Sequence, residues 1–449
     1  MELLGDLVNV ISDILPNFKS WGIEMATLAM FGTMLAFLLT GMPLAFVSLL
    51  VALIFALGWF GPASVTLITS RIFSFVNSFV FISVPMFVLM ASILDRSGIA
   101  RDLFDGMRLV GGRLRGGVAI QTLFVAVIMA AMSGIVDGEV VLLGMMALPQ
   151  MLRLGYDRKL AIGVCCAGGA LGTMIPPSIV LIVYGLTANV SIGDLFSASF
   201  LPGLMLASFY IIYVLIRSYA NHDLAPIANY EDVDRAEAIR LLKGLILPLM
   251  VVAFVLGSIY GGIASVSEAS AIGVLGVTIS TIIRREFTLT MMLGAARQTL
   301  ATVGMIVWIG IGASALVGVF GLMGGIKFIE EIIIGFSDNP TVIVLLMMAI
   351  LIVLGMFLDW VGIALLTMPI FVPIIIKLGL DPVWFGVVFC MNMQVSFLSP
   401  PFGPAAFFLK SVAPSDVSLG EIFVSLLPFI AMQILAVGLL IVFPGITLR

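Results

Sequence analysis

Long apolar segments follow one another along most of the chain, and short polar turns separate them. The longest approach the roughly 20 residues that an α-helix needs to cross a bilayer core. The pattern therefore predicts an all-α polytopic membrane protein. The predicted spans cover about 24–40, 43–60, 74–94 and 195–216 in the first half, and about 244–260, 263–283, 298–322 and 421–446 in the second.

Two apolar segments are interrupted by polar residues and do not fit a simple crossing. Residues 118–151 form two arms around Ser133–Glu139. At about 1.5 Å per residue, neither arm crosses a core of about 30 Å. Basic turns flank this segment, and Lys and Arg collect on the cytoplasmic side. We therefore expect a re-entrant hairpin over 118–151, and a second hairpin over 341–376 whose tip is Gly355–Asp359.

Each predicted hairpin is followed by an apolar segment that a Pro-Pro pair interrupts. The pairs begin at Pro176, within 160–188, and at Pro400, within 385–410. Two consecutive prolines stop a helix because each lacks a backbone donor. Broken helices inside a membrane supply N-termini for anions and free carbonyls for cations. The alternative is a kink that serves packing alone.

The two halves of the chain resemble each other. Pro149, Gly155, Asp157 and Pro176 each have an identical residue 224 positions later. The loops of the first copy are rich in Arg, whereas the matching loops of the second carry more acidic residues. Corresponding loops are therefore expected on opposite membrane faces, which makes the repeat an inverted one. The expected organisation is an amphipathic segment (1–23), a first repeat (24–216), a cytoplasmic linker (217–243) and a second repeat (244–449).

Composition supports a membrane protein and narrows its chemistry. The chain is 61% hydrophobic and 10% charged, whereas soluble domains carry about 25% charged residues. The net charge of −4 gives no indication of a nucleic-acid partner. The three cysteines fall in predicted spans as packing residues, and the single histidine, His222, has no second ligand nearby. Neither a metal site of His and Cys nor triad hydrolysis is indicated.

The stretches "GYDRKLAIGVCCAGGALGTMIPPSIVLIVYG" and "LGLDPVWFGVVFCMNMQVSFLSPPFGPAAFFLK" are similar to the large (DctM-like) membrane subunit of tripartite ATP-independent periplasmic (TRAP) transporters. The resemblance runs from about Gly41 to Leu427, and "SPPFGPAAFFLKSVAP" is similar to the mannitol/chloroaromatic branch. It implies a sodium-coupled importer of organic acids in the bacterial inner membrane. It also implies an elevator mechanism, a periplasmic solute-binding protein and a small four-helix membrane subunit as partners.

The resemblance implies two sets of site residues. Sodium is expected at the hairpin tips, through Ser133, Gly134, Gly355 and Asp359. Ser133 and Gly134 match the family's Ser-Gly-Ser-Ser tip, whereas Ile135 and Val136 depart from it. Substrate is expected at Gly172, Ile175, Pro176, Ser178, Asn392, Ser399, Pro400 and Gly403.

Four further residues keep two interpretations. Asp137 and Glu139 are either functional acids at membrane depth or helix-capping and ion-pairing residues. Arg71 is either a snorkelling arginine or a contact for a substrate carboxylate. Glu268, in "SVSEASA" where the family has "TPTEAAA", is either functional or part of a buried structural pair.

Two alternatives to the tripartite importer remain. The first is a stand-alone exchanger or exporter, coupled to sodium or to protons, without a binding protein. The second is a membrane enzyme or channel, for which the sequence offers no metal motif, nucleophile elbow or selectivity filter. We therefore expect a transporter rather than an enzyme.

Overall fold

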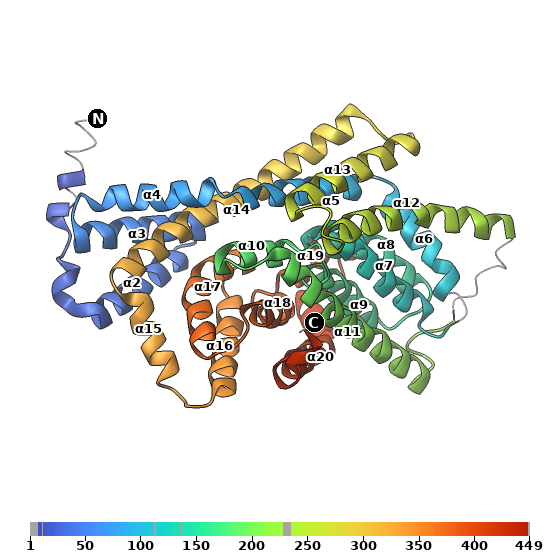
Figure 1. Ribbon diagram of the computed structural model, residues 1–449. Coiled ribbons are helices and arrows are strands. Elements are labelled where there is room, and N and C mark those ends of the chain that lie inside the picture. The colour runs from blue at the N-terminus through green and yellow to red at the C-terminus, as the bar shows by residue number, and fades with distance from the viewer. Residues whose placement is uncertain (1–7, 11, 112–113, 135, 228–234, 448–449) are drawn as a thin grey trace. The chain divides into compact units, whose positions relative to one another are not determined.

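The computed structural model describes residues 8–10, 12–111, 114–134, 136–227 and 235–447 (Figure 1). Within these ranges every regular element is a helix. Eight of the described helices are long and apolar enough to cross a membrane. The expected all-α polytopic architecture is therefore confirmed. Part of the predicted N-terminal segment (1–7 and 11) and part of the predicted linker (228–234) lie outside the described residues.

Helix contacts divide the chain into two compact units. The first unit comprises the chain up to residue 81 together with 302–349 and 358–382. Its helices are α2 (Gly22–Leu39), α3 (Leu44–Phe60), α4 (Ser64–Val76), most of α14 (Leu289–Leu322), α15 (Gly325–Ile334), the start of α16 (Pro340–Gly355) and α17 (Trp360–Lys377). Glycines of α14 allow close packing in this unit, because a side chain at Gly312 would overlap Ser48 of α3, and one at Gly310 would overlap Phe75 of α4.

The second unit comprises 82–301, 350–357 and 383–449. Its N-terminal helices are α5 (Ser83–Arg96), α6 (Ile99–Gly111), α7 (Gly117–Ser133), α8 (Val136–Arg153), α9 (Arg158–Ala170), η3 (Leu171–Thr173), α10 (Ile179–Ala188) and α11 (Ile192–Ala220). They are followed by α12 (Arg235–Tyr260), α13 (Val266–Ile283), nearly all of α18 (Pro382–Leu398), α19 (Pro404–Val412) and α20 (Leu419–Val442).

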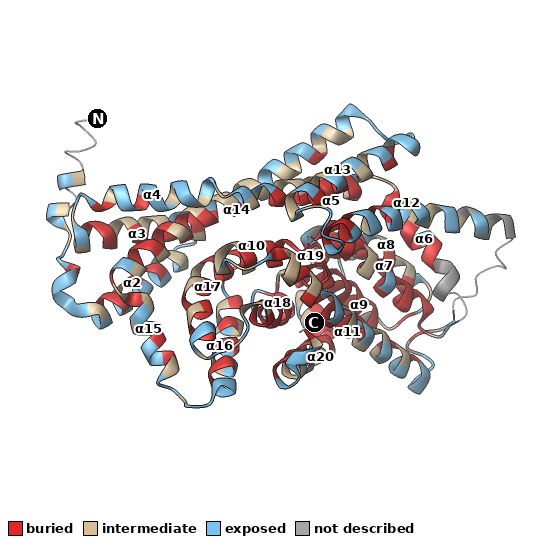
Figure 2. Cartoon of the chain, viewed as in Figure 1, coloured by how far each residue is buried: buried red, intermediate tan, exposed pale blue. Residues whose placement is uncertain are grey.

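Helix α9 is the centre of the second unit. It packs against α7, α8 and α20, and every residue from Leu160 to Ala170 is buried (Figure 2). Small residues make this possible, because a side chain at Gly163 would overlap Phe429 of α20 and one at Gly169 would overlap Val140 of α8. The thiols of Cys165 and Cys166 are buried in the same helix.

Several helices begin at a residue whose side chain accepts a hydrogen bond from the first turn. The N-cap residues are Asp157 for α9, Ser191 for α11, Ser265 for α13, Asp359 for α17 and Ser418 for α20. Such a cap contributes about 1 kcal/mol to helix stability, because it satisfies a backbone N–H that the helix leaves free. These polar residues fix the helix starts within otherwise apolar sequence.

The polar turn between α13 and α14 is attached to α6 through charged groups. The Arg284 guanidinium pairs with Asp102 and with Glu286 (Nη2···Oε1 2.9 Å), and the Glu286 carboxylate also accepts from the Gly98 N–H at 2.9 Å. The hydrogen bond from Arg284 lowers the pKa of the Glu286 carboxyl below its ordinary value. The ionised form of Glu286 is therefore the one that holds this turn.

Two helix boundaries differ from the sequence-based expectation. The predicted span over 74–94 is divided, because α4 ends where the Asn77 side chain donates to the Phe73 carbonyl at 3.0 Å. The crossing helix begins later and covers Phe79–Arg96. At the predicted linker, α11 continues to Ala220 and α12 begins at Arg235.

Candidate functional site

The tip of the first predicted hairpin is the turn that joins α7 and α8. Helix α7 ends at Ser133, and Gly134 follows in the left-handed conformation at φ 60°. The backbone N–H of Gly134 donates to the Ala130 carbonyl at 3.3 Å. The last turn of a helix leaves carbonyl groups without an intrahelical partner. This tip therefore presents negative helix-end dipoles together with the Ser133 hydroxyl.

The first Pro-Pro break lies directly against this tip. A side chain at Gly134 would overlap the Pro177 carbonyl oxygen, so the two backbones approach closely. On the break, the Ser178 hydroxyl donates to the Thr173 carbonyl at 2.6 Å, and the Thr173 hydroxyl donates to the Ala170 carbonyl at 3.0 Å. Ser133, Thr173 and Ser178 are all buried. Tip and break together form a buried cluster of hydroxyl and carbonyl oxygens.

Glu139 brings a carboxylate to the same cluster. The Ser133 hydroxyl donates to its Oε1, whereas its Oε2 has no hydrogen-bond partner among the described residues. Only 1% of the residue is exposed. A Cβ built on Gly172 would lie 3.0 Å from that Oε2, so the break also reaches this carboxylate. An ionised carboxyl in such surroundings is costly unless a cation or a proton compensates it.

Sequence reasoning missed three contributors to this region. Thr173 and the Pro177 carbonyl belong to the break. They lie next to Gly172 and Pro176 of the expected set, so the sequence did indicate this region. Asp95 lies in the last turn of α5, and a side chain at Gly138, beside Glu139, would place its Cβ 2.8 Å from the Asp95 Oδ2. No local pattern in the sequence connects Asp95 with the hairpin tip at Ser133–Glu139, which lies in a separate segment.

The residues expected at the second tip and break fall into different compact units. Asp359 belongs to the first unit, where it caps α17 by accepting from the Val361 N–H at 3.1 Å. Gly355, Ser399, Pro400 and Gly403 belong to the second. The Ser399 hydroxyl donates to the Val395 carbonyl at 2.7 Å, and Gly403 is the left-handed N-cap of α19.

Two polar residues of α18 are fully buried. Asn392 and Gln394 are each 0% exposed, and neither amide atom of Gln394 has a hydrogen-bond partner among the described residues. The same helix stacks Phe389 on Tyr184 of α10, with ring centroids 5.8 Å apart. Gln394 is therefore a further candidate for binding a polar ligand.

The remaining residues of the expected sets occupy varied positions. Ile175, which precedes the first break, packs against Gly203 of α11. Asp137 is exposed in the first turn of α8. Arg71 is exposed on α4 and lays its aliphatic stem on Gly318 of α14.

Glu268 is exposed and completes a capping box with Ser265, accepting from the Ser265 N–H at 2.7 Å. The expected alternative of a buried structural pair is therefore wrong, because the partner is the helix start itself.

Side chains that typically ligate metal ions do not gather in the described part of the chain. Among the described residues, no group of three or more His, Cys, Asp and Glu side chains could hold a metal ion. Sodium does not need such a group, since unwound backbone carbonyls and helix C-termini coordinate it in transporters with broken helices. The tip–break cluster offers groups of this kind.

The chain matches known transporter subunits over nearly its whole length. The family described as "Tripartite ATP-independent periplasmic transporter, DctM component" matches residues 31–446. The ectoine TRAP transporter large permease protein TeaC of Halomonas elongata is 30% identical, covering 94% of this chain and 98% of TeaC. The isethionate TRAP transporter permease protein DctMQ of Oleidesulfovibrio alaskensis is 28% identical over 90% of this chain, which spans 63% of that protein.

A solved structure supports the fold. The YdaH transporter of Alcanivorax borkumensis superposes with a TM-score of 0.64 at 14% identity, covering 86% of this chain and 89% of YdaH. Large permeases of the matched family are inner-membrane proteins that work with a small membrane subunit and a periplasmic binding protein. The mannitol/chloroaromatic branch stays a prediction. The chain belongs to the DctM family of large TRAP permease subunits, and its activity is secondary transport of organic acids rather than enzymatic catalysis.

Proposed function

We propose that this chain imports a small organic acid together with sodium ions, after a periplasmic solute-binding protein delivers the acid. The observation that carries the proposal is the contact between the α7–α8 tip and the first Pro-Pro break, at Gly134 and Pro177. Two irregular backbone segments meet there in a buried place. Irregular backbone at membrane depth is characteristic of transporter binding sites.

Sodium coupling is supported by the kind of atoms in this cluster. The hydroxyls of Ser133 and Thr173, the Pro177 carbonyl and the Glu139 carboxylate are oxygen groups that hard cations prefer. The free Oε2 of Glu139 adds negative charge where the α7 C-terminus already contributes a partial negative charge. A bound Na⁺ compensates both.

The anionic substrate needs positive partial charge, which helix N-termini supply. Ser178 is the N-cap of α10, directly after the first break, and Gly403 is the N-cap of α19, after the second. Free N–H groups at such helix starts bind carboxylates. For the conformational cycle we propose an elevator mechanism, in which the hairpins and broken helices move as one block.

Ligand-dependent stability tests sodium binding directly. A ligand that binds only the folded state at ten times its Kd adds about 1.4 kcal/mol to stability. We expect a higher Tm in sodium chloride than in choline chloride at equal ionic strength, and loss of this difference in Ser133→Ala. Ser199→Ala is the matched control, because Ser199 is also fully buried but lies on α11. Equal Tm values in both salts for the wild-type protein would contradict the proposal.

Transport in proteoliposomes tests the roles of Asp359 and of the binding protein. The assay combines both membrane subunits with binding protein loaded with the organic acid that a thermal-shift screen selects. Asp359→Ala is expected to abolish sodium-dependent uptake while the complex still assembles. Unchanged sodium dependence would remove Asp359 from the site. Full sodium-driven uptake without the binding protein would refute the tripartite mechanism.

One observation favours a second candidate, proton coupling in a stand-alone exchanger. Glu139 is fully buried, and its Oε2 has no described partner, so a proton compensates it as well as a cation does. Uptake driven by a pH gradient in sodium-free vesicles, and lost in Glu139→Gln, would identify this mechanism. Uptake that follows the sodium gradient alone excludes it.

A further inference from the structure

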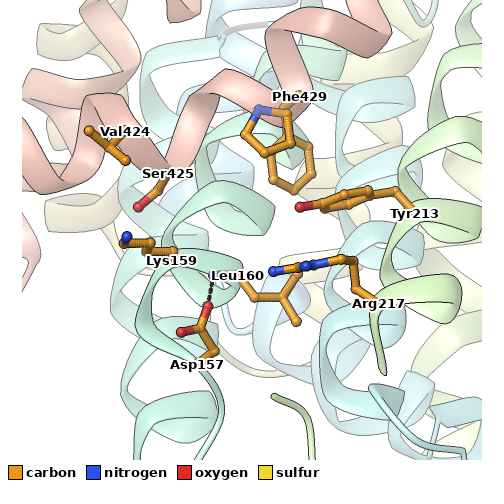
Figure 3. A pocket seen from close by; sticks show the side chains of 9 residues that line it. Asp157, Lys159, Leu160, Tyr213, Arg217, Val424, Ser425 and Phe429 are labelled. Atoms are coloured by element: carbon orange, nitrogen blue, oxygen red, sulfur yellow. Dashed lines mark hydrogen bonds between the residues drawn. The ribbon is translucent and has the colours of Figure 1, made fainter. Parts of the chain in front are cut away.

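A cavity opens in the second unit where the start of α9, the end of α11 and the first turns of α20 meet (Figure 3). Its volume is about 280 Å³. One side is polar and consists of Lys159, Tyr213 and Arg217, and the other is apolar and includes Val424, Pro428 and Phe429. The cavity is therefore amphipathic.

The polar side carries uncompensated positive charge. Tyr213 and Arg217 extend from successive turns of α11 toward α9 (Figure 3). Asp157, the acid of the lining, caps α9 by accepting from the Leu160 N–H at 2.9 Å. No carboxylate in the described ranges forms an ion pair with Lys159 or Arg217. Two cations thus face one acid.

The neighbouring cation is used differently. Arg158 pairs with Asp416 at 2.8 Å and with Glu421 at 3.2 Å. These acids form their ion pairs with Arg158, and neither forms one with Lys159 or Arg217. Lys159 and Arg217 line the cavity from two different helices, α9 and α11 (Figure 3). Both cations suit a phosphate group, which accepts several hydrogen bonds at once.

The position of the cavity indicates where this anion comes from. Helices α11 and α20 are both long and apolar enough to cross a membrane, and the cavity lies at the end of one and the start of the other. Basic residues mark this boundary as the cytoplasmic one. Large apolar side chains beside the cavity are exposed on both helices, with Ile216 at 62% and Leu427 at 55%.

We propose that the cavity binds the headgroup of an anionic phospholipid from the cytoplasmic leaflet. The phosphate contacts Lys159 and Arg217, and the acyl chains lie along the exposed apolar residues of α11 and α20. The inference does not depend on the coupling ion, because the lining contains no residue of the tip or break. The lipid contacts the first turn of α9, the helix that leads into the first break.

Short-chain lipids added to the purified full-length protein test the inference through the Tm. Dioctanoyl phosphatidylglycerol is expected to raise the Tm, and dioctanoyl phosphatidylcholine is expected to have little effect. Each Lys or Arg near an anionic lipid increases the affinity for that lipid about fivefold. Lys159→Gln and Arg217→Gln should each weaken phosphatidylglycerol binding about fivefold, and the double variant about thirtyfold.

Two further variants separate a specific site from general surface charge. Arg153→Gln, at the exposed end of α8, changes the net charge equally outside the cavity and should bind normally. Val424→Trp fills the apolar side without changing charge and should reduce binding. Equal binding by wild type, the double variant and Val424→Trp would overturn the proposal. It would also be overturned if phosphatidylcholine, or inorganic phosphate alone, raised the Tm as much as phosphatidylglycerol does.

Discussion

Replacing Gly134 by Ala tests the contact between the hairpin tip and the Pro-Pro break. The residue has φ 60°, and left-handed backbone costs an L-residue about 1–2 kcal/mol. The added Cβ would also overlap the Pro177 carbonyl oxygen and lie 3.2 Å from its carbonyl carbon and 3.4 Å from the Ser178 Cα. These are backbone atoms that cannot rotate away, and such overpacking costs about 1–3 kcal/mol. The sum is about 2–5 kcal/mol, concentrated at the tip.

The assay combines thermal unfolding in detergent with sodium-driven uptake by proteoliposomes. Gly155→Ala is the matched control, because Gly155 has φ 82° just after α8, and its nearest neighbour to an added Cβ is Pro226 Cγ at 3.9 Å. We expect Gly134→Ala to lower the Tm about twice as much as Gly155→Ala does, and to lose nearly all uptake. Equal Tm losses in the two variants, or normal uptake by Gly134→Ala, would show that the tip does not rest on the break.

Three further changes test contacts outside the tip. Because Arg284 lowers the pKa of Glu286, this ion pair stabilises the fold above a pH of about 4.5, and the stabilisation is lost as the pH falls further. Glu286→Gln should therefore flatten the acid side of a plot of Tm against pH. Glu268→Gln should keep both Tm and uptake, because Gln also completes a capping box with Ser265, whereas Glu268→Ala should lower the Tm slightly. Loss of uptake in the Gln variant would instead indicate a functional carboxylate. Trp384→Phe removes the indole donor to a backbone carbonyl of α20, 2.9 Å away, and should cost about 1 kcal/mol, measured as a lower Tm.

Sequence patterns predicted the places where helices stop better than the contacts between them. The Pro-Pro pairs and the tip at Ser133 are breaks that local chemistry dictates, and helices end at both in the structure. The capping box at Ser265 was also readable, since Ser followed three residues later by Glu is its signature. The resemblance to the family suggested a functional role for Glu268, although the Ser265–Glu268 spacing is enough to explain its position.

Contacts between distant segments could not be predicted from one sequence. Nothing in the pattern of apolar residues pairs Arg284 with Asp102, or places Asp95 beside Gly138, because hydrophobicity constrains which face is buried and not which partner covers it. The same holds for Gly134 and Pro177, which lie in separate segments of the chain. The inverted arrangement of the repeat also stays a prediction, based on loop charge.

The burial of the native thiols has a practical consequence for spectroscopy. Cys165, Cys166 and Cys390 are all fully buried in helices, so water-soluble maleimides should not reach them while the protein is folded. A reporter cysteine placed at an exposed position in a polar segment, such as His222 after α11, would then be labelled alone in the otherwise unmodified chain. Distance measurements during transport can therefore begin without first replacing small residues in α9, where a larger substitute has little room.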